Sequence, residues 1–171
     1  MSDRARMLGA VSFMVKAHGD QKRNYTGEPY AVHPLEVAGI LADYGFQDEV
    51  VIAGLFHDVV EDTKVTLEDI KEKFGHRIAK LVEEVTDVST PLHGNRATRK
   101  GMNREHLAKA SYYGQSIKVA DLISNSRDIM AHDPNFAKVY LKEKEALLEV
   151  LVKADDDLLS VARAFVIGGQ K

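Results

Sequence analysis

The chain has 171 residues, of which 44% are hydrophobic and 29% are charged, and its net charge at pH 7 is −3. Such a chain can bury roughly two thirds of its unfolded surface, so it predicts one globular domain over residues 1–171 and excludes a disordered or fibrous protein. The small negative charge gives no electrostatic reason to bind nucleic acid or an anionic membrane.

Apolar residues recur at helical spacing along most of the chain and predict an all-α, single-domain fold of about eight to ten helices. In chain order, the expected helices cover residues 3–18, 34–44, 50–62, 66–74, 76–87, 103–111, 115–131, 135–153 and 155–166. We expect the third helix to be central, because its apolar residues are nearly continuous. Polar segments with glycine and proline, residues 19–33 and 89–101, are expected to be loops. No alternation typical of β-strands appears.

Cysteine is absent, which excludes disulfides, thiolate metal ligands and a cysteine nucleophile. No run of about 18 apolar residues predicts a membrane span. The charged residues near the N-terminus, followed by helical spacing, do not resemble a signal peptide. We therefore expect a cytoplasmic protein in which any metal ion is held by histidines and carboxylates, and we make no prediction of its oligomeric state.

The stretch GLFHDVVEDT, residues 54–63, gathers one imidazole and three carboxylates at the end of the third expected helix. These groups are His57, Asp58, Glu61 and Asp62. On a continuous helix they would share one arc of the surface, where carboxylates oppose the negative end of the helix dipole. A surface ion pair with Lys64 is worth about 0–1 kcal/mol and cannot neutralise three carboxylates, whereas a divalent cation can. The alternative is a frayed, solvated helix end.

Two further residues interrupt apolar surroundings in the same way. Asp121 lies inside the apolar helix 115–131, with Asn125 one turn later. A buried, unpaired charge costs several kcal/mol, so Asp121 needs a partner, either a metal ion or Lys118 in a structural ion pair. His33 directly precedes the helix-opening Pro34, and it is either a ligand or a capping or packing residue.

Together these positions supply two imidazoles and two carboxylates for a metal ion. The candidate ligands are His33, His57, Asp58 and Asp121. A mixed nitrogen and oxygen set suits Mn²⁺, Fe²⁺ or Zn²⁺ better than Ca²⁺ or Mg²⁺, and the sequence does not choose among the three.

Six stretches of the chain resemble successive motifs of one known family. They are HGDQKR, GEPYAVHPLEVAGIL, AGLFHDVVEDT, TLEDIKEKFG, LVEEVTD and KVADLISNSRD. These motifs resemble the hydrolase domain of RelA/SpoT proteins, a group within the HD superfamily of metal-dependent phosphohydrolases, in the small stand-alone form found in metazoans. The resemblance covers about residues 5 to 155.

The resemblance implies removal of the 3′-pyrophosphate from the alarmones ppGpp and pppGpp, with Mn²⁺ as the usual metal. No synthetase pattern follows, so we expect degradation only. A related hydrolase acting on NADPH or on deoxynucleotides is the first alternative. A module that binds alarmone without turnover is the second, although such a module has no need of an acid that activates water.

The resemblance also assigns roles by position. His33, His57, Asp58 and Asp121 match the family's metal ligands, and Glu61 and Asp62 match its catalytic acidic pair, which would orient or deprotonate water and protonate the leaving oxygen. The residues that match substrate contacts are Arg23 against the purine base, Arg99 and Lys100 near the phosphates, Asn125 in the site and Tyr140 in the nucleotide pocket. Asn24 departs from the family pattern, because many relatives have a second basic residue there.

Overall fold

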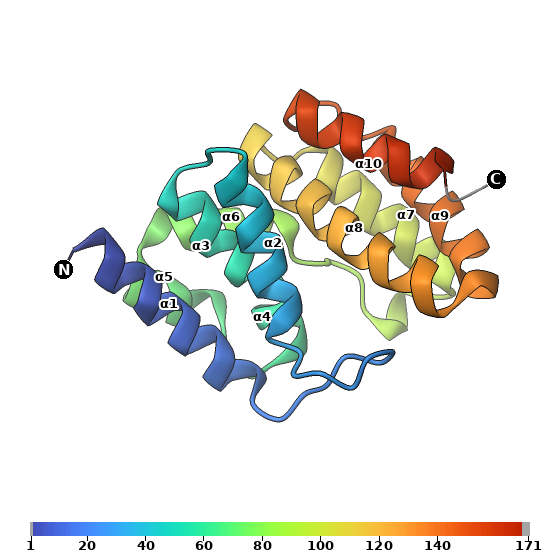
Figure 1. The fold of residues 1–171 in the computed structure, drawn as a ribbon. Coiled ribbons are helices and arrows are strands. Elements are labelled where there is room, and N and C mark those ends of the chain that lie inside the picture. The colour runs from blue at the N-terminus through green and yellow to red at the C-terminus, as the bar shows by residue number, and fades with distance from the viewer. Residues whose placement is uncertain (1, 169–171) are drawn as a thin grey trace. The chain divides into compact units, whose positions relative to one another are not determined.

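The computed structural model describes residues 2–168. Their backbone forms helices α1 to α10 and one 3₁₀ helix, η1, with a single isolated antiparallel bridge between Lys22 and Pro29 (Figure 1). The all-α fold expected from the sequence is therefore confirmed. The chain divides into two compact units, Met1–Thr86 and Asp87–Lys171. The single domain expected over residues 1–171 stays a prediction.

The first unit is built around α3. Its helices are α1 (Asp3–His18), α2 (Val32–Asp43), α3 (Asp48–Leu55), α4 (Val59–Asp62), α5 (Leu67–Phe74) and α6 (His76–Val85). Helix α3 contacts α1, α2 and α6, and every residue from Val50 to Leu55 is buried. A helix that is apolar on all sides must be covered on all sides, so the expected central position of this segment is confirmed within the unit.

Gly54 allows α2 and α3 to pack closely. A Cβ atom at this position would lie 2.5 Å from Cδ1 of Leu41 and 3.6 Å from Cγ1 of Val37, both on α2. Carbon atoms pack at about 3.5–4.0 Å, so an alanine does not fit unless the Leu41 side chain or α2 itself moves. The glycine therefore leaves room for the Leu41 side chain where α2 packs on α3.

The expected continuous helix over residues 50–62 is wrong. Helix α3 ends at Leu55, and α4 begins at Val59. Between them the backbone N–H groups of Phe56, His57 and Val59 donate to carbonyls three residues earlier, as in a 3₁₀ turn. The ring of Phe56 is buried against Phe13 and Phe74. Tertiary packing and this turn, neither of which the helical period reveals, therefore end the helix early.

The second unit is arranged around one long helix. Its elements are η1 (Pro91–His93), α7 (Arg96–Ala108), α8 (Tyr112–His132), α9 (Pro134–Leu148) and α10 (Asp156–Gly168). Helix α8 contacts α7, α9 and α10, as Figure 1 shows in yellow to red. The buried side chain of Gln115 on α8 donates to the carbonyl of Leu107 and accepts from the N–H of Lys153, and so ties α8 to both flanking segments.

The expected loop over residues 89–101 is wrong in its second half. Helix α7 begins at Arg96, because the side chain of Asn95 accepts from the N–H of Thr98 and caps it. Arg99 and Lys100 therefore lie on a helix. No helix among residues 2–168 is long and apolar enough to span a membrane.

Candidate metal centre

Three donor side chains of the first unit converge on one point. The Nε2 atoms of His33 and His57 lie 3.2 Å apart, and Oδ2 of Asp58 lies 2.9 Å from Nε2 of His57 and 3.7 Å from Nε2 of His33. His33 is on the first turn of α2, whereas His57 and Asp58 belong to the turn between α3 and α4. Among the described residues, these three form a group that can hold a metal ion.

The carbonyl of Gly54 fixes the tautomer of His57. Nδ1 of His57 lies 2.8 Å from this carbonyl oxygen, which can only accept, so Nδ1 carries the proton. In the neutral ring Nε2 then presents its lone pair to His33 and Asp58. This is the arrangement that metal-binding histidines adopt, with the second nitrogen held by a carbonyl or carboxylate.

Tyr30 holds the carboxylate of Asp58. Its hydroxyl donates to Oδ2 at 2.5 Å, and its ring packs edge-on to that of His33 with centroids 5.9 Å apart. Tyr30 comes three residues before His33, one turn back along the chain. Tyr30 is not among the site residues expected from the sequence, although its place inside the PYAVHP motif was the signal that could have identified it.

The catalytic pair expected from the sequence lies on α4. Glu61 and Asp62 are both exposed there, one turn after His57 and Asp58. Although the residue is exposed, neighbouring atoms partly desolvate its carboxyl group, and this desolvation, followed by the nearby Asp58 carboxylate, raises the pKa of Asp62 above its usual range, whereas His18 and His57 lower it. A carboxyl group with a raised pKa is better suited to give up a proton near neutral pH.

Asp121, the fourth expected ligand, belongs to the second unit. It is buried on α8, where Oδ2 lies 2.9 Å from Nζ of Lys118 and Oδ1 accepts from the Asn125 amide at 2.7 Å. The structural ion pair weighed in the sequence analysis is therefore present. A role for Asp121 in holding metal stays a prediction.

The five expected substrate contacts are divided between the units. Arg23 is half-buried in the loop between α1 and α2, and Asn24 beside it is exposed. The other four positions lie in the second unit: Arg99 and Lys100 on α7, Asn125 on α8 and Tyr140 on α9.

Tyr140 is the most buried of these expected contacts. Its side chain is 6% exposed, and burial, followed by the charge of Asp121, raises the pKa of its hydroxyl. Tyr140 therefore stays protonated and remains a hydrogen-bond donor at neutral pH.

The chain matches known proteins over most of its length. A family model described as HD domain matches residues 10–144. The chain is 39% identical over 136 residues to the guanosine-3′,5′-bis(diphosphate) 3′-pyrophosphohydrolase MESH1 of Xenopus tropicalis, covering 78% of this chain and 74% of that protein. It is 56% identical over 79 residues to a guanosine-3′,5′-bis(diphosphate) 3′-pyrophosphohydrolase of Aquifex aeolicus, covering 46% of this chain and 11% of that one.

The fold is also found among solved structures. A metazoan ortholog of SpoT, described as hydrolysing ppGpp, matches with a TM-score of 0.86 and 27% identity over 96% of this chain and 95% of that chain. The family resemblance expected from the motifs is thus confirmed. The chain belongs to the HD domain family and is a relative of the MESH1 proteins.

Proposed function

We propose that the chain is a metal-dependent guanosine-3′,5′-bis(diphosphate) 3′-pyrophosphohydrolase that converts ppGpp and pppGpp to GDP and GTP with release of pyrophosphate. The observation that carries this proposal is the convergence of His33, His57 and Asp58 in a chain whose MESH1 relatives bear that activity in their names. The expected cytoplasmic location and a guanosine polyphosphate partner belong to the same proposal.

The donor set fits a divalent transition metal. Two buried imidazole nitrogens and a carboxylate oxygen lie within 4.8 Å of one another. Nε2 of His57 presents its lone pair to this group when His57 is protonated at Nδ1, and His33 does the same when its own proton is on Nδ1. We assign Mn²⁺, with Fe²⁺ and Zn²⁺ as competitors for the same ligands, and Asp121 as the fourth protein ligand. When bound, such an ion lowers the pKa of its water toward about 7 and withdraws charge from phosphoryl oxygens.

The acidic pair on α4 supplies the proton transfers. Glu61 accepts the proton of the attacking water, which adds to the phosphorus atom joined to the 3′ oxygen. The bond between that phosphorus and the 3′ oxygen then breaks, and Asp62, whose pKa is raised, donates a proton to the leaving oxygen. Because the two carboxyl groups are sequence neighbours, we expect them to titrate as a coupled pair.

The remaining predicted residues bind the nucleotide. Arg23 packs on the guanine base, Tyr140 and Asn125 line the nucleoside pocket, and Arg99 and Lys100 bind phosphate oxygens. Position 24 is an exposed, uncharged asparagine, so the site lacks a second cation next to Arg23. We therefore expect weaker phosphate binding than in relatives that have a basic residue there.

A substrate panel tests the proposal. The purified protein is loaded with Mn²⁺ and assayed against ppGpp, pppGpp, NADPH and deoxynucleoside triphosphates, with released pyrophosphate and orthophosphate measured separately. We expect pyrophosphate from the guanosine polyphosphates at the highest kcat/KM. Orthophosphate from NADPH, or turnover of deoxynucleotides alone, would replace the proposed substrate. Tight ppGpp binding without single-turnover hydrolysis would identify a non-catalytic alarmone-binding module instead.

A further inference from the structure

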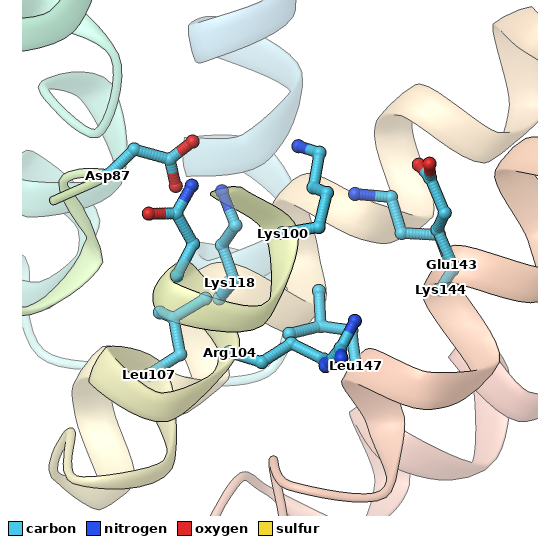
Figure 2. Close-up of a pocket in the computed structure, with 9 residues that line it drawn as sticks. Asp87, Lys100, Arg104, Leu107, Lys118, Glu143, Lys144 and Leu147 are labelled. Atoms are coloured by element: carbon cyan, nitrogen blue, oxygen red, sulfur yellow. The ribbon is translucent and has the colours of Figure 1, made fainter. Parts of the chain in front are cut away.

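The second unit contains a cavity lined mainly by positive charge. Side chains from α7, α8 and α9, with Asp87, enclose about 50 Å³ (Figure 2). The charged lining residues are Lys100, Arg104, Lys118, Lys144, Asp87 and Glu143. Four cations therefore face two carboxylates within one small space.

The two carboxylates do not balance the four cations. Glu143 is already engaged by Arg96, whose Nε and second terminal nitrogen each lie 2.7 Å from a carboxylate oxygen. The ammonium group of Lys118 is in turn paired with Asp121 at 2.9 Å. Glu143 also attracts Lys100 and Lys144, so this Arg96-bound carboxylate and Asp87 together face Lys100, Arg104 and Lys144.

The pKa of Lys144 indicates that the positive charges of the cavity lining are only partly neutralised. Burial, followed by repulsion from Lys118 and Lys100, lowers the pKa of its ammonium group to about 8, although Asp121 and Asp87 oppose the shift. An anion within the cavity would reverse both causes, because it replaces lost hydration and offsets the neighbouring cations.

Asn103 adds an oriented neutral donor. It is 5% exposed, and its Oδ1 accepts from the backbone N–H groups of Val88 at 3.2 Å and Ser89 at 3.0 Å. These two bonds fix which way the amide faces, so its nitrogen, a hydrogen-bond donor, points away from the Val88–Ser89 backbone. Asn103 is one of the residues that line the cavity. A site with several cations and a fixed amide donor favours a ligand that carries many acceptor oxygens.

We propose that this cavity binds a phosphate-class dianion through Lys100, Arg104, Lys144 and the Asn103 amide. Its volume of about 50 Å³ is several times the roughly 10–15 Å³ needed to hold one water molecule, so a small ligand larger than water fits. Guanidinium and ammonium groups form their strongest hydrogen bonds with such oxygens. The phosphate is either a free anion or one group of a nucleotide, and both present the same chemistry to the cavity.

Calorimetry at low salt tests the proposal. Orthophosphate is titrated into the full chain, which has first been dialysed against a chelator so that no metal ion contributes. We expect one site, and we expect Lys144→Met and Arg104→Gln each to weaken binding by about tenfold or more. The matched controls are Lys142→Met, an exposed lysine on α9, and Lys109→Gln, an exposed lysine directly after α7. Both controls are expected to bind as the wild type does.

Proton uptake gives a second readout. Because an anion raises the pKa of Lys144, binding near pH 8 should take up a fraction of a proton, measured as a dependence of the binding heat on the buffer. Lys144→Met should abolish this uptake. Absence of binding at millimolar orthophosphate, or equal binding by all four variants, overturns the proposal, provided that circular dichroism shows each variant folded.

Two further titrations identify the source of the phosphate. If ppGpp binding to a Glu61→Gln background weakens with Lys144→Met and is competed by orthophosphate, the cavity takes a phosphate group of the nucleotide. If ppGpp affinity is unchanged while orthophosphate binding is lost, the cavity takes a free anion. Both results support the site. The proposed function fails separately, through absence of ppGpp hydrolysis while orthophosphate still binds.

Discussion

The hydroxyl of Tyr30 donates to Oδ2 of Asp58 at 2.5 Å, and this bond holds the carboxylate oxygen next to the Nε2 atoms of His57 and His33. We expect Tyr30→Phe to lower Mn²⁺ affinity by about 10–100-fold, the usual cost of losing a group that orients a metal ligand. Metal-dependent thermal stabilisation and metal content after gel filtration measure the effect. Tyr25→Phe, an exposed tyrosine of the same loop, is the control, and equal affinity in the two variants would contradict the assignment.

Glu61 tests the chemistry separately from the metal. Glu61→Gln keeps the size of the side chain but removes the base, so we expect kcat to fall by about 10²–10⁴-fold while Mn²⁺ content is unchanged. Glu68→Gln removes an exposed carboxylate from the neighbouring helix α5 and should leave both quantities unaltered. Full turnover by Glu61→Gln would refute its role as the base.

Gly54 tests the packing of α2 against α3. Gly54→Ala places a methyl group 2.5 Å from Cδ1 of Leu41, so we expect the free energy of unfolding to fall by about 1–3 kcal/mol, measured by urea denaturation. Gly39→Ala on α2 has no atom within 4 Å of the added carbon and should raise it by about 0.5–1 kcal/mol. In the double variant with Leu41→Ala the two losses should not add.

Lys144 makes stability depend on pH. Its pKa is about 8 in the folded chain, against the usual 10.5, so between these values the unfolded chain binds more protons. The free energy of unfolding should therefore rise from about pH 8 to about pH 10.5. Desolvation is the main cause of this shift; among the charged groups around Lys144, Lys118 and Lys100 add to it, and Asp121 and Asp87 oppose it.

The matched variant is Lys144→Met. It should be more stable than the wild type near pH 7, and its free energy of unfolding should not rise between about pH 8 and pH 10.5. Urea denaturation at several pH values measures both effects. An unchanged pH profile in Lys144→Met would contradict the lowered pKa.

Helical periodicity and capping patterns were sufficient to predict the fold class and most helices. The helix expected over residues 66–74, for instance, is found as α5, Leu67–Phe74, and its start is fixed by a capping box of Thr66 and Asp69 with both hydrogen bonds present. The break at Leu55 was not predictable in this way, because it depends on the burial of Phe56 and on the bond between His57 and the Gly54 carbonyl. Local spacing carries no information on such tertiary contacts.

Site residues could be predicted from the sequence where a side chain able to bind metal lies among apolar residues. His33 and His57 each stood out in apolar segments, and the structure brings them together with Asp58. Tyr30 was missed because a tyrosine beside a proline looks like an ordinary packing residue. Lys144 was missed because alternating charges on a helix are typical of a solvated face, and only the meeting of α7, α8 and α9 encloses it.

Gly54 contributes both to the packing of the hydrophobic core and to the orientation of the histidine cluster. The space above its Cα admits Leu41, while its carbonyl oxygen holds the ring of His57. A substitution in the interior that drives α2 and α3 apart would therefore tilt an imidazole that it never touches. A loss of metal affinity would then report the packing defect early, while the helices themselves are still folded.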